Sequence, residues 1–304
     1  MTLRNTLDQA QEEATALQAT ADDLGAQLTA AREQIATLEA RDCEDQATID
    51  ALRPLVAPHC PIGFAGTPPT GIAERAHRVY LNPGEAFPAL PPGVLPFVTF
   101  KGANDVRLRC DQARAFGAPL FLGFAHEPEN DLTPQAFIAA WQVLGAYCPR
   151  NARTVMVLMA ATYAAGNADV WYPGDDAVDV VGADGYDWAG ARTDKGGDGY
   201  SKPGASHRSF AKIFEPVEAF AARHGKPIAV GEFGTPDDHD GPQRKADWLA
   251  EAGAHLRATP AYVAATYFQH SSKTGDAKCT WSLDTPEAIA AWQALLDDPY
   301  FGGL

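Results

Sequence analysis

The sequence predicts an α/β protein in which a (β/α)8 TIM barrel over residues 61–304 follows an N-terminal α-helical coiled coil over residues 1–53. Two observations predict this arrangement. Short apolar runs rich in β-branched and aromatic residues alternate with helical stretches after residue 60, as they do around a parallel sheet. Before residue 54, apolar residues keep a heptad spacing, which is typical of a coiled coil.

The heptad pattern extends from Leu3 to Leu52, with most apolar residues alternately four and three positions apart. A helix with so narrow a stripe needs a partner, because isolated helices are only marginally stable in water. We therefore expect residues 3–52 to form a homo-oligomer; a single amphipathic helix packed on the barrel is the alternative. Residues 1–53 hold four basic and eleven acidic side chains, so the apolar seam has to overcome charge repulsion.

A proline-rich stretch separates this helix from the rest of the chain. Pro54, Pro58 and Pro61 end the helix, and the composition then shifts from Gln, Glu and Ala to Gly, Pro and aromatic residues. We interpret residues 54–60 as a short linker and residues 61–304 as one domain.

Eight apolar runs in that domain are interpreted as strands. They cover residues 61–66, 78–81, 95–100, 120–125, 154–160, 178–183, 228–230 and 262–268. Helices are predicted over residues 134–147, 210–224 and 243–257. Eight strands in about 245 residues fit a TIM barrel. An open doubly wound sheet would carry a Gly-rich phosphate turn after its first strand, and GFAGTPP at 63–69 is not such a turn.

The composition argues against several classes of partner. With 24 basic and 39 acidic residues, the formal net charge is −15, which disfavours binding to nucleic acid or to an anionic membrane surface. We recognise neither a signal peptide nor an apolar run long enough to span a membrane. The five cysteines are scattered without a CxxC pair, so we expect mostly buried thiols rather than a zinc site or a disulfide framework.

Two glutamates stand where a barrel enzyme places its chemistry, at the carboxyl ends of strands. The fourth run continues as PLFLGFAHEPEN with Glu127, and the seventh as KPIAVGEFGTP with Glu232. Either glutamate alone could merely cap the next helix. Together they are more specific, because hydrolysis of a glycosidic bond needs a proton donor and a second carboxylate on opposite sides of the anomeric carbon.

In these motifs the chain resembles the clan of (β/α)8 retaining glycoside hydrolases, whose acid/base and nucleophile glutamates end the fourth and seventh strands. The His126–Glu127 pair resembles that of family 26, the mannanase family, whereas Pro128 resembles the Asn-Glu-Pro motif of other families. The resemblance implies that Tyr186, after the sixth run, orients the nucleophile by a hydrogen bond. The clan's arginine near the end of an early strand has no counterpart in the expected place, since Arg78 stands at the start of the second run.

Further residues are candidates for substrate contacts. Sugars present apolar faces to aromatic rings, which makes Trp188 and Trp281 candidate platforms, and His126 is expected to bind a sugar hydroxyl or the acid/base. Other residues at or near predicted strand ends are Phe64, Lys101, Tyr163, Tyr267 and Gln269. The acidic stretches 194–198 and 237–240 are interpreted as solvated loops rather than metal sites, and we expect no metal and no cofactor.

The sequence thus predicts a retaining glycoside hydrolase that cleaves a bacterial surface glycan or a polysaccharide of the β-mannan or β-glucan type. The alternatives are a catalytically silent carbohydrate-binding or adhesion barrel on a coiled-coil stalk, or a barrel enzyme of unrelated chemistry. A stalk joined to a hydrolase resembles the organisation of bacteriophage tail proteins that cut surface glycans. That resemblance implies a trimer in a virion tail, with other tail proteins as candidate partners; a cytoplasmic enzyme is the alternative localisation.

Overall fold

A computed structural model describes residues 59–87, 89–189, 206–236, 243–270 and 281–302. The predicted coiled coil over residues 1–53 lies outside the described residues, as does the predicted linker up to residue 58. No helix in the described ranges is long and apolar enough to cross a membrane.

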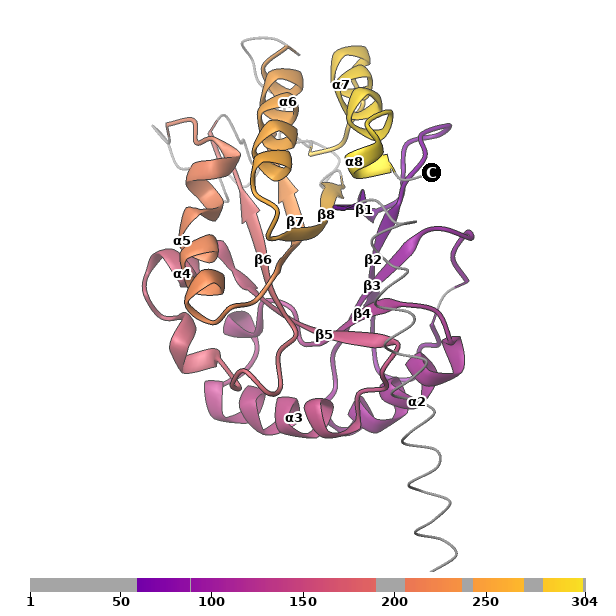
Figure 1. Ribbon diagram of the computed structural model, residues 1–304, viewed down its shortest axis with the longest axis vertical. Coiled ribbons are helices and arrows are strands. Elements are labelled where there is room, and N and C mark those ends of the chain that lie inside the picture. The colour runs from indigo at the N-terminus through magenta and orange to yellow at the C-terminus, as the bar shows by residue number, and fades with distance from the viewer. Residues whose placement is uncertain (1–58, 88, 190–205, 237–242, 271–280, 303–304) are drawn as a thin grey trace, which may run out of the picture. The chain divides into compact units, whose positions relative to one another are not determined.

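Eight parallel strands close into a barrel in the order of the chain, with β1 paired to β8 (Figure 1). This confirms the predicted (β/α)8 barrel. The strands are β1 Ile62–Gly66, β2 Ala76–Leu81, β3 Leu95–Phe100, β4 Leu120–Phe124, β5 Ala152–Met159, β6 Val180–Tyr186, β7 Ile228–Gly234 and β8 Tyr262–Gln269.

Most strands differ from the predicted runs by one to four residues at an end, and the differences in three of them affect the site. β2 begins at Ala76, two residues before the predicted run, because pairing with β1 and β3 includes Ala76 and the polar His77. β6 continues to Tyr186 and β7 to Gly234. Glycines in both segments weaken the apolar signal, whereas pairing between the two strands continues to their ends.

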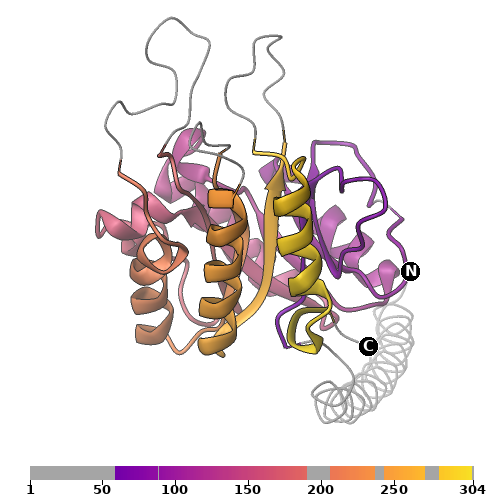
Figure 2. The ribbon, with the colours of Figure 1, turned by 90° about the horizontal axis from the view of Figure 1, so that it is seen from above.

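Helices cover the outside of the barrel, and Figure 2 shows α5, α6 and α7 side by side along one flank. Side-chain caps fix the starts of three helices: Thr133, Ser209 and Thr285 each accept a backbone N–H three residues on. The α-helices are α2 Val106–Phe116, α3 Pro134–Tyr147, α4 Ala160–Ala164, α5 Phe210–Arg223, α6 Gln243–Ala258, α7 Pro286–Leu296 and α8 Pro299–Gly302. Short 3-10 helices are η1 Ala103–Asp105, η2 Pro128–Asn130 and η3 Ala168–Trp171.

The core has two layers, because successive strand residues point to opposite faces of the sheet. One layer lies between the strands and the helices and contains the buried tryptophans Trp141, Trp248 and Trp292. The other is formed by alternate strand residues alone and fills the barrel interior: Phe97, Phe121, Val155, Val157, Val180, Ala229 and Ala264. The same alternation decides which polar side chains reach the mouth.

β7 carries a bulge at the height of the mouth. Against β6, the register passes from Val230 opposite Ala183 to Glu232 opposite Asp184, which leaves Gly231 without a partner. The ladder with β8 is irregular in the same place. A bulge re-aims the side chains that follow it. Glu232 therefore faces the interior, whereas strict alternation would turn it toward the helices with Val230.

Candidate active site

Glu232 accepts one hydrogen bond on each of its carboxylate oxygens. Tyr80 of β2 donates to Oε1, and Tyr186 at the end of β6 donates to Oε2. Glu232 is only 8% exposed. Burial, and then the nearby Glu232 carboxylate, raises the pKa of both tyrosines well above its usual range, so that both hydroxyls keep the protons they donate. The tyrosines therefore fix the carboxylate in one orientation.

One step further into the barrel, a buried ion pair supports this carboxylate. Nη2 of Arg78 lies 3.8 Å from Oδ2 of Asp184, and both side chains are fully buried. Burial, followed by the Glu232 charge, raises the pKa of Asp184, and Arg78 counteracts that increase. Gly231 makes room for the pair, because a Cβ at that position would fall 2.0 Å from Nη1 of Arg78. The bulge that turns Glu232 inward therefore also accommodates the arginine.

Glu127 lies in a tight turn after β4. Two residues of this turn, Ala125 and Glu127, have left-handed backbone angles, with φ of 51° and 45°. Such angles are uncommon for residues other than glycine and concentrate at functional sites. The Glu127 amide donates to the carbonyl of Val157 at 3.1 Å, and the Asn130 side-chain amide donates to Oε2 of Glu127 at 3.0 Å. These contacts hold the carboxyl group at the mouth.

The environment of Glu127 favours its protonated form. Burial makes the largest contribution, followed by the charges of Glu232 and Glu129, and together they raise the pKa of Glu127 to about 7. Glu129 is itself fixed, because its Oε1 accepts the Met159 amide at 2.9 Å and the Thr162 hydroxyl at 2.5 Å. Glu127 is thus a carboxylic acid that keeps its proton up to neutral pH.

His126 is a neutral imidazole beside the pair. Burial, with smaller contributions from the charges of Arg78 and Lys101, lowers its pKa to about 3. The ring contacts Tyr80 edge to face at 4.8 Å, and Nδ1 lies 3.3 Å from the Thr99 hydroxyl. A neutral imidazole both donates and accepts, so His126 can bind a sugar hydroxyl without adding charge.

An aromatic cluster flanks Glu232 on the side of β6 and β8. The Trp281 ring lies 4.9 Å from Tyr186 and 5.0 Å from Trp188, and Phe268 lies 5.6 Å from Tyr186. Trp281 is buried, whereas the other three rings are partly exposed. The predicted platform residues Trp188 and Trp281 thus pack against each other and against the tyrosine that binds Glu232.

Two other predicted contact residues at the mouth are engaged with the protein itself. Lys101, just after β3, forms an ion pair with Asp131, and both side chains are about half exposed. The side-chain oxygen of Gln269 accepts the backbone N–H of Leu283 at 2.8 Å. Lys101 can still reach a ligand, whereas Gln269 fastens the end of the loop that follows β8.

Three predicted contact residues do not reach the mouth: Tyr267 and Phe64 are 0% exposed, and Tyr163 is 5% exposed. Tyr267 and Phe64 both pack against Trp292 of α7, with ring centroids 5.8 Å and 4.8 Å away. Tyr267 follows Thr266, whose side chain faces the barrel interior. Because adjacent strand residues point to opposite faces, the Tyr267 side chain lies between barrel and helices. A substrate contact from Tyr267 therefore has no support in the structure.

The sequence interpretation missed Tyr80 and misjudged Arg78. It placed Arg78 at the start of a strand, but β2 begins at Ala76, so Arg78 lies inside the barrel and interacts electrostatically with Glu232. A signal was present: Arg78 and Tyr80 are two positions apart in a short apolar strand, which places both on one face. Polar residues with this spacing near a strand end point into the barrel mouth.

The arrangement can donate a proton from one side and present a fixed carboxylate from the other. Among the described residues, no group of three or more His, Cys, Asp or Glu side chains is arranged to hold a metal ion. The acidic stretches 194–198 and 237–240, which the sequence raised as metal candidates, lie outside the described residues.

Comparisons with known proteins show one curated relative and several solved structures that are similar to this chain. No protein-family profile matches the chain. A curated relative, Endoglucanase H of Acetivibrio thermocellus, is 26% identical over 198 residues, which cover 59% of this chain and 20% of the relative. The chain therefore spans about a fifth of the length of this relative.

Among solved structures, the barrel aligns with a family 128 (subgroup I) endo-β-1,3-glucanase from Amycolatopsis mediterranei in complex with laminaritriose. The TM-score is 0.53 at 19% identity, covering 77% of this chain and 99% of that one. A variant of that enzyme with laminarihexaose aligns at a TM-score of 0.52 and 19% identity, covering 77% and 98%. A family 26 endo-β-1,4-mannanase domain from Bacillus sp. JAMB-750 aligns at 0.47 and 13% identity, covering 69% and 67%. The two family 128 alignments confirm the predicted resemblance to (β/α)8 glycoside hydrolases at the level of the fold.

Proposed function

We propose that this chain is a retaining glycoside hydrolase that cleaves a polysaccharide, with Glu232 as the nucleophile and Glu127 as the acid/base. The observation that carries the proposal is the contrast between the two carboxyl groups of the mouth. Each oxygen of Glu232 accepts a tyrosine hydroxyl, whereas the pKa of Glu127 is raised to about 7. A fixed carboxylate facing a protonated acid is the pair that this reaction needs.

In the first step, a carboxylate oxygen of Glu232 forms a bond to the anomeric carbon while the bond from that carbon to the leaving oxygen breaks. The proton of Glu127 goes to the leaving oxygen. Tyr80 and Tyr186 hold the attacking carboxylate during this step. In retaining enzymes the two carboxyl groups are roughly 5–5.5 Å apart, which leaves no room for a water molecule and favours the covalent glycosyl-enzyme.

In the second step, Glu127 is ionised and takes a proton from a water molecule. The water oxygen bonds to the anomeric carbon, and Glu232 leaves as a carboxylate. Both displacements invert the anomeric carbon, so the product retains the original configuration. Glu127 ends the cycle protonated, as its pKa of about 7 favours at neutral pH.

The substrate that we favour is a neutral β-glucan, with β-mannan and bacterial surface glycans as further candidates. The curated relative is named an endoglucanase and the aligned family 128 enzyme an endo-β-1,3-glucanase. The exposed parts of Trp188 and Phe268 beside Glu232 suit the apolar faces of sugar rings. Lys101 is neutralised by Asp131, so it gives no reason to expect an anionic sugar.

The coiled coil remains part of this proposal. An oligomeric stalk over residues 3–52, with a trimer favoured, would present several barrels to one glycan surface, which is the organisation proposed above for a virion tail protein. Linked sites raise the avidity for a multivalent surface without any new contact. The heptad pattern supports the oligomer, and the resemblance to bacteriophage tail proteins supports the trimer and the virion tail.

The test is a panel of β-1,3-glucans, β-1,4-glucans, β-mannans, xylans and bacterial envelope glycans, with detection of new reducing ends. E232A should abolish turnover of every substrate. E127A should keep activity on aryl glycosides with good leaving groups and recover with azide, while it loses roughly a hundredfold or more on natural glycan. Glu215→Gln, in the exposed face of α5, is the matched control and should behave as the wild type.

Proton NMR of the first product distinguishes the mechanisms. The retained anomer is expected, and an inverted first product would exclude the covalent route. If glycans bind but no variant-sensitive turnover appears on any substrate, the barrel is a carbohydrate-binding module and the enzymatic proposal fails.

A further inference from the structure

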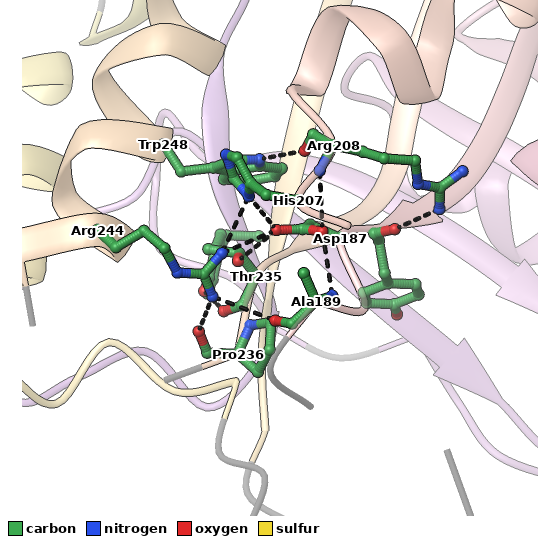
Figure 3. Close-up of polar contacts among 10 residues, drawn as sticks. Asp187, Ala189, His207, Arg208, Thr235, Pro236, Arg244 and Trp248 are labelled. Atoms are coloured by element: carbon green, nitrogen blue, oxygen red, sulfur yellow. Dashed lines mark hydrogen bonds and ion pairs between the residues drawn. The ribbon is translucent and has the colours of Figure 1, made fainter. Parts of the chain in front are cut away.

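Asp187 is a fully buried carboxylate directly behind the mouth. It stands between Tyr186, which binds Glu232, and Trp188, which packs on Trp281. The Asp187 side chain is 0% exposed and lies among residues from the ends of β6 and β7 and the start of α6 (Figure 3). Its own amide donates to the carbonyl of Gly234 in β7 at 3.0 Å.

Five donors converge on the two oxygens of Asp187. A carboxylate can only accept, so His207 donates to Oδ2 at 2.6 Å in the tautomer that has its proton on Nδ1. The full set is the Ala189 amide at 3.2 Å, His207 Nδ1 at 2.6 Å, the Arg208 amide at 3.2 Å, the Thr235 hydroxyl at 3.3 Å and Arg244 Nη1 at 3.0 Å. One buried side chain therefore joins residues 189, 207–208, 235 and 244.

Arg244 completes the arrangement from the first turn of α6. Besides its ion pair with Asp187, its Nη2 donates to the carbonyls of Ala189 at 3.2 Å and Pro236 at 3.4 Å. Planar guanidinium groups hold several acceptors in one fixed geometry, which an ammonium group cannot do. The Arg244 side chain thus fixes the backbone after β6 to the backbone after β7.

Lys245, next to Arg244, links the start of α6 to the segment that carries Trp281. Lys245 is 2% exposed, and its Nζ donates to the carbonyl of Ser282 at 2.8 Å. Ser282 follows Trp281, whose ring lies against both Tyr186 and Trp188. The start of α6 therefore contacts the chain after β6, β7 and β8, which together carry the aromatic cluster and border Glu232.

We propose that Asp187, held by Arg244, is a positioning residue of the active site: it sets the hydrogen bond from Tyr186 to Glu232 and the packing of Trp188 on Trp281. This inference rests on the proposed function. Asp187 lies on the side of the chain opposite to the mouth, so it acts through its two neighbours rather than by touching substrate. An active-site group displaced by about 1 Å costs on the order of a hundredfold in rate.

The test compares D187N, R244Q and R244K with the wild type on a short aryl glycoside and on the polysaccharide that the panel identifies. D187N keeps the size of the side chain but replaces one acceptor oxygen by a donor, so it opposes the donors around it. We expect kcat per folded molecule to fall by roughly tenfold to a hundredfold on both substrates for D187N and R244Q. R244K keeps the positive charge but lacks the planar guanidinium group. Its kcat should therefore lie between that of R244Q and that of the wild type.

A stability control separates positioning from mere loss of structure. Val217→Ala removes two methyl groups from the fully buried face of α5, and it should lower Tm while kcat well below Tm stays unchanged. Near-UV circular dichroism gives a second readout, because the Trp188 and Trp281 rings lie 5.0 Å apart in an edge-to-face pair. The near-UV band that is lost in W188F is the band of this tryptophan pair. We expect D187N to lose the same band and V217A to keep it.

The outcomes distinguish the two proposals. If the wild type hydrolyses a glycan and D187N keeps both its kcat and the tryptophan band, the positioning inference is wrong and the proposed function stands. If the wild type hydrolyses nothing, the proposed function fails, and the tryptophan band in D187N alone decides the role of Asp187.

Discussion

At the scale of single residues, Glu127 sets the expected pH dependence. Its pKa is raised to about 7, so the proton that the first step needs is present below that pH and is lost above it. We therefore expect kcat/KM to fall above about pH 7, approaching tenfold per unit. Initial rates on a polysaccharide from pH 5 to 9 measure this descending limb of the pH profile of kcat/KM.

Glu129→Gln tests the cause of that shift. Glu129 is one of the charges that raise the pKa of Glu127, and the Gln oxygen can still accept the Met159 amide. The descending limb should move to lower pH in E129Q and stay in place in the exposed α5 variant E215Q. A limb that moves upward, or not at all, would contradict the electrostatic account of Glu127.

Tyr80 is the site residue with the sharpest single test. Tyr80→Phe removes the donor to Oε1 of Glu232, as Tyr186→Phe removes the donor to Oε2. Hydrogen bonds to charged groups contribute about 1.5–3 kcal/mol, so each variant should lose roughly tenfold to a hundredfold in kcat. Stopped-flow or steady-state kinetics measures the loss.

Tyr172→Phe is the matched control, because its hydroxyl donates to the Asp175 carboxylate at 2.8 Å, away from the mouth. It removes the same kind of contact and should leave kcat unchanged. Wild-type kcat in Tyr80→Phe would show that one tyrosine suffices to hold the nucleophile.

At the scale of elements, the bulge in β7 decides where Glu232 points. The Thr266 hydroxyl in β8 donates to the carbonyl of Gly231, the unpaired residue of the bulge. Thr266→Val removes this donor and leaves a buried carbonyl unsatisfied, which costs about 1–3 kcal/mol. We expect a lower stability together with a kcat reduced by about tenfold, because the neighbouring Glu232 shifts.

Thr154→Val provides the comparison for this prediction. Thr154 is also a buried strand threonine, and its hydroxyl donates to the Ala177 carbonyl at 2.9 Å near the start of β5. Because this hydroxyl also accepts the Asp179 amide at 2.9 Å, Thr154→Val should lower stability at least as much, without a loss in kcat. Denaturant unfolding and kinetics on both variants decide between a catalytic and a merely structural role of the bulge contact.

At the scale of the whole molecule, the prediction concerns the division of the chain. Deleting residues 1–53 should give a monomeric barrel with unchanged kcat on a short soluble oligosaccharide and weaker binding to a multivalent glycan surface. Light scattering on the full-length and truncated proteins measures the assembly. A monomeric full-length protein, or a folded but inactive truncated one, would mean that the helix packs on the barrel and that the division is wrong.

The sequence by itself determined the barrel and the positions of two glutamates, Glu127 just after its fourth strand and Glu232 near the end of its seventh. Apolar runs of strand length separated by amphipathic helices specify a parallel sheet. The spacing of apolar residues along the chain matches the spacing at which strands and helices bury their side chains. Glu127 could be recognised because chemistry in this fold lies at strand ends, and the turn after the fourth run is short. The start of α3 was equally readable, since Thr133 followed by Pro134 is a local capping signal.

Only the tertiary structure decided how the site is assembled. The inward orientation of Glu232 depends on the register of β7 against two neighbours, and its partner Tyr80 is 152 residues away in the chain. Tyr267 was misjudged because its strand face follows from the pairing of β8 rather than from its own residue type. Raised and lowered pKa values likewise arise from burial and from charges on other strands. Local pattern fixes an element, whereas register and burial are set by contacts between distant parts of the chain.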